Sequence, residues 1–111
     1  MERTTYFVDV LLPLPIPDFF TYRVPHDFEG TLDFGIRVVV PFGKNRLYSA
    51  LVVKKHTTPP RSFSVKYIID TVDERPIIAK KQFALWQWMA DYYMCTLGEV
   101  MTAALPSALK L

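Results

Sequence analysis

Apolar and polar residues follow two different patterns along the chain. Up to about residue 73, short apolar runs rich in Val, Ile, Phe and Tyr are separated by Pro, Gly and Asp. Such runs between turn formers are typical of β-strands. They predict strands at residues 6–12, 19–22, 36–40, 48–53 and 65–72.

From about residue 80 the apolar pattern becomes helical. Phe83, Trp86, Ala90 and Tyr93 recur at steps of three and four residues, which predicts a helix over residues 80–94. A second, short helix is expected over residues 99–105. Trp86 and Trp88 would lie about 200° apart on such a helix, so both cannot face one core. We expect Trp86, which lies on the apolar stripe, to be buried.

The sequence therefore predicts an α+β protein that is mainly β. We expect a small, twisted or barrel-like sheet of about five strands, followed by a C-terminal helical unit. The β part is predicted over residues 5–73 and the helical part over residues 78–105, in a single domain of residues 1–111. The tail, PSALKL, carries no stop signal, so we expect a fragment of a longer protein.

The centre of this pattern is the segment 36–53, IRVVVPFGKNRLYSALVV, which predicts a hairpin. Pro41 cannot donate to a strand ladder and should end the first strand. Gly43 can adopt a positive φ and lets a ligand approach its backbone closely. Lys44 and Arg46 place two positive charges at the tip.

Positive charge is concentrated around this hairpin. The whole chain has a formal charge of +2, but residues 36–69 contain no Asp or Glu and seven basic residues: Arg37, Lys44, Arg46, Lys54, Lys55, Arg61 and Lys66. Segregated positive charge is typical of a surface that binds a polyanion. It is equally typical of an edge hairpin that lysines protect from aggregation. Charge alone leaves both interpretations open.

An aromatic cluster precedes the hairpin. Phe20 and Tyr22 are two residues apart and share one face of the predicted strand, while Phe19 and Thr21 share the other. Aromatic side chains beside a basic hairpin suit the stacking of nucleobases. We expect Phe19 to pack in the core.

Several classes of function are disfavoured. No apolar run approaches the ~20 residues of a membrane span, so we expect no membrane partner. One cysteine, Cys95, allows no internal disulfide and indicates a reducing, intracellular compartment. The two histidines are far apart in the sequence, so we expect no metal site within this chain, and phosphate-binding loop motifs are missing. We therefore expect no catalytic residues, and no enzyme activity or cofactor for this chain alone.

Four segments together resemble a known family. They are VLLPLPIPDFFTYRVP, GIRVVVPFGKNRLYSALVV, VKYIIDTVDERPII and WQWMADYYMCTLGEVMTAALP, in that order. They are similar to the N-terminal 3′-end DNA-binding domain of the PriA (primosomal protein N-prime) replication-restart helicases. The resemblance implies capture of the 3′-OH end of the nascent leading strand at stalled replication forks.

The resemblance also implies a larger context. Full-length members are ATP-dependent 3′–5′ DNA helicases, so ATP, Mg and Zn are expected only in the remainder of such a protein. Implied partners are DNA 3′ ends, the helicase domains of the same chain, other primosome proteins and single-strand-binding protein. The implied location is the bacterial cytoplasm, associated with the nucleoid.

The resemblance places the 3′-end pocket on Phe20, Thr21, Tyr22, Gly43 and Lys66. Thr21 stands where the family pattern has Asp, so an uncharged hydroxyl that both donates and accepts replaces a carboxylate. Phosphate contacts are expected from Lys44, Arg46 and Lys54.

Other classes remain open at this point. The chain could be a protein-interaction or structural domain that docks through its tryptophans. It could also be a general single-stranded nucleic-acid-binding barrel without end specificity, including an RNA-binding one of translation-factor type. Oligonucleotides with free and phosphorylated 3′ ends, and DNA compared with RNA ends, would separate these classes.

Overall fold

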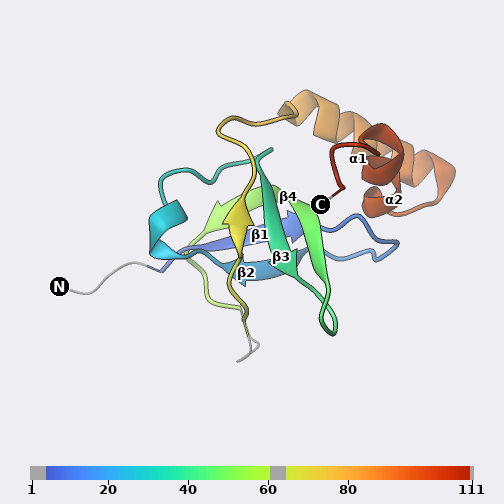
Figure 1. Ribbon diagram of the computed structural model, residues 1–111. Coiled ribbons are helices and arrows are strands. Elements are labelled where there is room, and N and C mark those ends of the chain that lie inside the picture. The colour runs from blue at the N-terminus through green and yellow to red at the C-terminus, as the bar shows by residue number, and fades with distance from the viewer. Residues whose placement is uncertain (1–4, 61–64, 111) are drawn as a thin grey trace.

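Short runs of β-branched and aromatic residues form a five-stranded antiparallel sheet, followed by two helices (Figure 1). The computed structural model describes residues 5–60 and 65–110. The strands are β1 (Phe7–Leu11), β2 (Phe20–Arg23), β3 (Arg37–Pro41), β4 (Leu47–His56) and β5 (Asp70–Thr71), in the order β2-β1-β4-β3-β5. The helices are α1 (Lys80–Tyr93) and α2 (Leu97–Ala104), with a 3-10 turn at His26–Phe28. The predicted fold class is confirmed.

The sheet is not a closed barrel, and the segment before β5 forms backbone hydrogen bonds with both β2 and β3. The backbone N–H of Arg23 donates to the carbonyl of Lys66 (2.9 Å), and the N–H of Ile68 donates back to Arg23 (3.1 Å). One residue later, the N–H of Ile69 donates to the carbonyl of Val39 on β3 (2.8 Å). Residues 66–69 thus span the gap from β2 to β3 and hold Lys66 beside β2.

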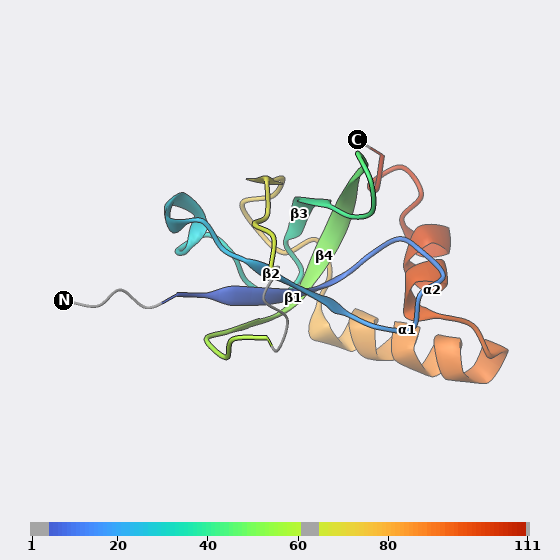
Figure 2. The same ribbon diagram turned by 90° about the horizontal axis from the view of Figure 1, so that it is seen from below.

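The core has two parts. Inward-facing valines of β1, β3 and β4 are fully buried on one face, and these are Val8, Val10, Val38, Val40 and Val52. On the other side, Leu11 and Leu51 are directly opposed across β1 and β4 and pack with Trp86 and Met101 of the helices. The helical pair therefore lies against the end of the sheet that Leu11 and Leu51 form (Figure 2).

The two helices begin in different ways. Ala79 precedes α1 and offers no side-chain cap. Thr96 caps α2 by accepting from the Glu99 N–H, while the Glu99 carboxylate accepts from the Thr96 N–H. This capping box places the start of α2 at Leu97, two residues before the predicted start. Neither of the described helices is long and apolar enough to cross a membrane.

The tryptophan prediction is correct and the tyrosine prediction is wrong. Trp86 is 3% exposed, whereas Trp88 is 58% exposed and stacks on Tyr92. Tyr93 was expected on the buried stripe but is exposed. Its position in the last turn explains this, because that end of α1 extends past the sheet (Figure 2).

The strand predicted at residues 65–72 is largely wrong. Only Asp70–Thr71 pairs as a strand with β3, and Tyr67 forms an isolated bridge with Arg23. The reason is tertiary: the segment changes partner from β2 to β3 between Ile68 and Ile69, so it builds no continuous ladder with either. By contrast, β3 ends at Pro41 as expected, and β4 extends three residues further than predicted, to His56.

Candidate nucleic-acid interface

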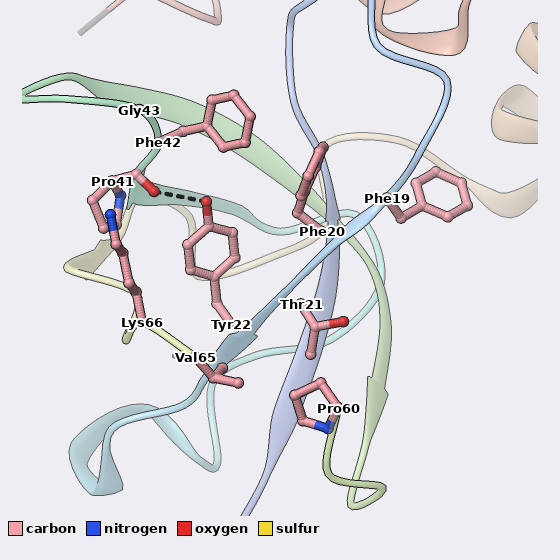
Figure 3. Close-up of a pocket in the computed structure, with 10 residues that line it drawn as sticks. All are labelled: Phe19, Phe20, Thr21, Tyr22, Pro41, Phe42, Gly43, Pro60, Val65 and Lys66. Atoms are coloured by element: carbon pink, nitrogen blue, oxygen red, sulfur yellow. Dashed lines mark hydrogen bonds between the residues drawn. The ribbon is translucent and has the colours of Figure 1, made fainter. Parts of the chain in front are cut away.

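The residues that the resemblance indicated surround one pocket of about 400 Å³ (Figure 3). It lies at the edge of β2, between that strand, the β3–β4 turn and the segment before β5. The lining residues are Phe19, Phe20, Thr21, Tyr22, Pro41, Phe42, Gly43, Pro60, Val65 and Lys66. All five expected pocket residues are therefore together, and their role in binding stays a prediction.

Backbone groups of β2 are turned toward this pocket. The N–H of Val24 donates to Tyr6 on the β1 side (2.9 Å), while the N–H of Arg23 donates to Lys66 on the opposite side. Backbone direction alternates along a strand, so Thr21 points its N–H and C=O the same way as Arg23. The edge of β2 at Thr21 thus presents a donor and an acceptor away from β1.

Tyr22 supports the wall of the pocket, but its ring is buried and is not available for stacking on a base. Its side chain is 4% exposed, and its hydroxyl donates to the carbonyl of Pro41 (2.7 Å; Figure 3). Burial raises the pKa of Tyr22 to about 12. This hydrogen bond ties β2 to the residue at which the hairpin turn begins.

Phe20 and Phe19 supply the accessible aromatic surface. Phe20 is half-buried and packs edge-to-face on Phe42, with ring centroids 4.8 Å apart. Phe19 was expected in the core, and that expectation is wrong, because it is 43% exposed. Neighbouring residues of a strand point to opposite faces, so the core-facing position of Phe20 turns Phe19 outward. Both residues line the pocket, and the Phe19 ring points away from Tyr22 and Gly43 (Figure 3).

The backbone of the turn favours glycine at residue 43. Its φ is +72°, in the left-handed region that favours glycine, and Asn45 follows with φ 58°. The turn is closed by the Phe42 N–H, which donates to the Arg46 carbonyl (3.1 Å). A Cβ added at Gly43 would meet no atom of the described chain within 4 Å. The side of the turn at Gly43 is therefore open to a ligand.

The expected phosphate-binding residues do not form one cluster. Lys44 and Arg46 are exposed in the turn beside Gly43. Lys54 is also exposed but lies opposite Asp9, eight residues further along β4. At 3.4 Å per residue that is roughly 27 Å from Arg46. Only Lys44 and Arg46 are placed beside the turn that borders the pocket.

Two of the seven basic residues in this region serve the fold. The Arg37 guanidinium binds Asp73 through Nη2–Oδ1 (2.6 Å) and Nε–Oδ2 (2.9 Å), and these hydrogen bonds lower the pKa of Asp73. The Lys55 ammonium donates to the Glu29 carbonyl and lies 4.8 Å from the Tyr6 ring centroid. Arg61 lies outside the described residues.

The cationic surface is consequently smaller than the sequence indicates. The remaining four basic residues are exposed, and within residues 5–60 and 65–110 none of them forms an ion pair: Lys44, Arg46, Lys54 and Lys66. Lys66 lines the pocket itself.

Sequence reasoning missed a polar group behind Thr21. Asp9 is paired with Thr21 across β1 and β2, and Thr21 Oγ1 donates to Asp9 Oδ1 (2.6 Å). His56 Nε2 lies 3.0 Å from the same oxygen. These residues are far apart in sequence, and no spacing rule joins them without the strand register. Phe42, Pro60 and Val65 were missed for the same reason.

The chain is similar to known proteins over most of its length. A protein-family model described as the PriA 3′DNA-binding domain (3′BD) matches residues 9–106. The chain is 32% identical over 103 residues to the replication restart protein PriA of Haemophilus influenzae, and 29% identical over 105 residues to that of Treponema pallidum. These matches cover 93% and 91% of the chain, but only 14% and 16% of the relatives. The PriA of Bacillus subtilis is 30% identical over 82% of the chain, which corresponds to 11% of that relative.

Proposed function

The chain belongs to the family of PriA 3′DNA-binding domains, and we propose that its pocket binds the free 3′-OH end of a DNA strand. The strand in question is the nascent leading strand at a stalled replication fork. The observation that carries this proposal is the convergence of Phe20, Thr21, Gly43 and Lys66 on one pocket at the edge of β2.

Each part of a terminal nucleotide has a suitable partner there. The base can stack on the ring of Phe20, a residue that lines the pocket, with Phe19 beside it. The 3′-hydroxyl can approach the backbone at Gly43 and the ammonium of Lys66. The phosphate on its 5′ side can reach Lys44 or Arg46 at the exposed turn. Such contacts read the end of a strand and little of its sequence.

The remainder of the implied machinery would lie outside this chain, which spans 11–16% of the PriA relatives described above. We propose that the domain serves a longer ATP-dependent helicase. In that protein the ATP, Mg and Zn sites, and the contacts with primosome proteins and single-strand-binding protein, would belong to other regions.

The test compares one oligonucleotide with a 3′-OH end and the same oligonucleotide with a 3′-phosphate, by fluorescence anisotropy. We expect the 3′-OH form to bind at least about tenfold more tightly, because a further phosphate would have to enter the pocket. Lys66→Ala should weaken the 3′-OH complex by ~1–3 kcal/mol, the range of a charge-assisted hydrogen bond. Lys54→Ala is the matched control, since this exposed lysine lies far from the pocket.

Two results would redirect the assignment. Equal affinity for both ends would leave a general single-strand binder. Failure to bind either oligonucleotide would favour a protein-interaction domain, for which the exposed, stacked pair Trp88 and Tyr92 on α1 is the candidate surface.

A further inference from the structure

A chain of hydrogen bonds reaches the pocket from the outer face of β1. The hydroxyl of Thr21 donates to Asp9 Oδ1 (2.6 Å), and this hydrogen bond is partly buried. The same carboxylate oxygen lies 3.0 Å from His56 Nε2. Only Thr21 of these three residues lines the pocket. Asp9 and His56 can therefore act on the pocket only through the orientation of that hydroxyl.

The donor and the acceptor can be assigned for each hydrogen bond that links Thr58, His56, Asp9 and Thr21. The backbone N–H of Thr58 lies 3.2 Å from His56 Nδ1. A backbone N–H can only donate, so Nδ1 accepts and the ring proton is on Nε2. Nε2–H then donates to Asp9, whose carboxylate also accepts from Thr21. The Asp9 carboxylate thus accepts from both Thr21 and His56.

This arrangement uses the one proton that Thr21 can donate. A threonine hydroxyl has one O–H donor and two acceptor lone pairs. With its proton held by a carboxylate, Thr21 Oγ1 can only accept from a bound ligand, and the short bond to a charged acceptor strengthens it in that role. We propose that Asp9, positioned by His56, makes Thr21 an acceptor that reads an N–H group on the edge of the terminal base.

The inference rests on the proposed binding of a 3′ end and adds the chemistry by which the base is read. Adenine and cytosine offer an amino group, guanine offers N–H groups at two positions, and thymine offers one N–H. An acceptor therefore suits all four bases. All four bases also offer an acceptor on this edge, so the loss of a single N–H donor, and not tolerance of the four bases, is what tests the proposal.

The test removes a single donor from the ligand. One oligonucleotide ends in 2′-deoxyadenosine, and the other ends in purine 2′-deoxyriboside, which lacks only the 6-amino group. The unmodified protein should bind the adenine end about 3- to 10-fold more tightly, the range of one net hydrogen bond. Thr21→Val keeps the side-chain shape without the hydroxyl and should bring this ratio to about one.

Substitutions of Asp9 separate orientation from mere support of the fold. Asp9→Ala releases the hydroxyl, which can then donate to the purine N1, so the ratio should fall below about twofold. Asp9→Asn keeps an acceptor at Oδ1 and should retain the ratio of the unmodified protein. Asp18→Ala is the matched control, because this exposed acid precedes β2 and makes none of these contacts. A purely structural role would weaken both complexes equally and leave the ratio unchanged.

The outcomes are distinguishable from those of the proposed function. The ratio of 3′-OH to 3′-phosphate binding is measured on the same variants. A preserved preference for the 3′-OH end, with an adenine-to-purine ratio of one in the unmodified protein, overturns this inference and leaves end binding intact. An Asp9→Ala variant that folds and retains the full ratio overturns it as well. Loss of the 3′-OH preference in the unmodified protein overturns the proposed function instead.

Discussion

Some residues around the pocket support its structure and others are accessible to a ligand. The type of side chain alone does not show which role a residue has. Tyr22 is aromatic and lies in the pocket wall, yet its hydroxyl is committed to Pro41 and its ring to the core. Phe19, which we expected to pack in the core, is the more accessible ring. Gly43 has neither ring nor charge, and its contribution is a backbone conformation with φ +72°.

Gly43 allows a sharp test at this scale. Asn tolerates a positive φ better than other non-glycine residues, so Gly43→Asn should keep the turn while placing a side chain on its open side. We expect affinity for a 3′-OH end to fall at least about tenfold, with the free energy of unfolding changed by less than ~1 kcal/mol. Anisotropy and chemical denaturation measure the two quantities.

Gly43→Val is the comparison, because a β-branched residue is strained at this φ and should lower both binding and stability. If the Asn variant bound 3′-OH ends as tightly as the unmodified protein, glycine would serve the turn alone.

Among the elements, those defined by their own sequence were predictable and those defined by a partner were not. β1, β3 and β4 follow from runs of β-branched residues, and α1 follows from the spacing of Phe83, Trp86 and Ala90. The segment 65–72 reads as a strand but is divided between two neighbours. The start of α2 was expected at residue 99, but Thr96 begins the helix earlier through its capping box.

Gly98 illustrates how packing can override helix propensity. It lies in the first turn of α2, where Ala would normally be favoured over Gly by up to ~1 kcal/mol. A Cβ at this position would lie 2.1 Å from the Leu14 carbonyl oxygen and 2.6 Å from that of Leu12. The helix is thus in direct contact with the backbone of the proline-rich segment that leads to β2.

Gly98→Ala should therefore destabilise the protein, opposite in sign to the propensity. We expect a loss of ~1–3 kcal/mol in the free energy of unfolding, as for other overpacked sites, measured by chemical denaturation. Ala103→Gly is the control for propensity, since it exchanges the same two residues at an exposed position of α2. A Gly98→Ala variant as stable as the unmodified protein would show that α2 can move away from Leu12 and Leu14 at little cost.

At the scale of the whole molecule, the fold could be predicted from the sequence pattern more fully than the pocket could. The sheet followed by helices could be derived from pattern alone. Membership of the pocket came from the family resemblance, with support from the aromatic and basic residues near the hairpin. The Asp9–Thr21–His56 group could not be derived, because it depends on the register of β1 with β2 and β4.

The number of positive charges available to a ligand also could not be predicted from the sequence. Seven basic residues in residues 36–69 indicated a broad cationic surface. The structure assigns Arg37 to Asp73 and Lys55 to Glu29 and Tyr6, so these two charges support the fold. Sequence composition cannot distinguish a cation that pairs within the chain from one that is available to a ligand.

The dependence of binding on salt measures how many cations are available. Each phosphate neutralised on a single strand contributes about −0.7 to the slope of log K against log salt concentration. Contacts from Lys44, Arg46 and Lys66 therefore predict a slope of about −2. Replacing both Lys44 and Arg46 by Ala should reduce its magnitude by about one unit or more.

Lys55→Gln is the matched control, because its ammonium is held by the Glu29 carbonyl and the Tyr6 ring and should change the slope by less than about 0.5. The measurement is a series of anisotropy titrations of a 3′-OH oligonucleotide between low and physiological salt. A slope near zero would remove electrostatics from the binding mechanism. A change for Lys55→Gln as large as that for the double variant would show that the DNA extends over the β1–β4 face, well beyond the turn at Gly43.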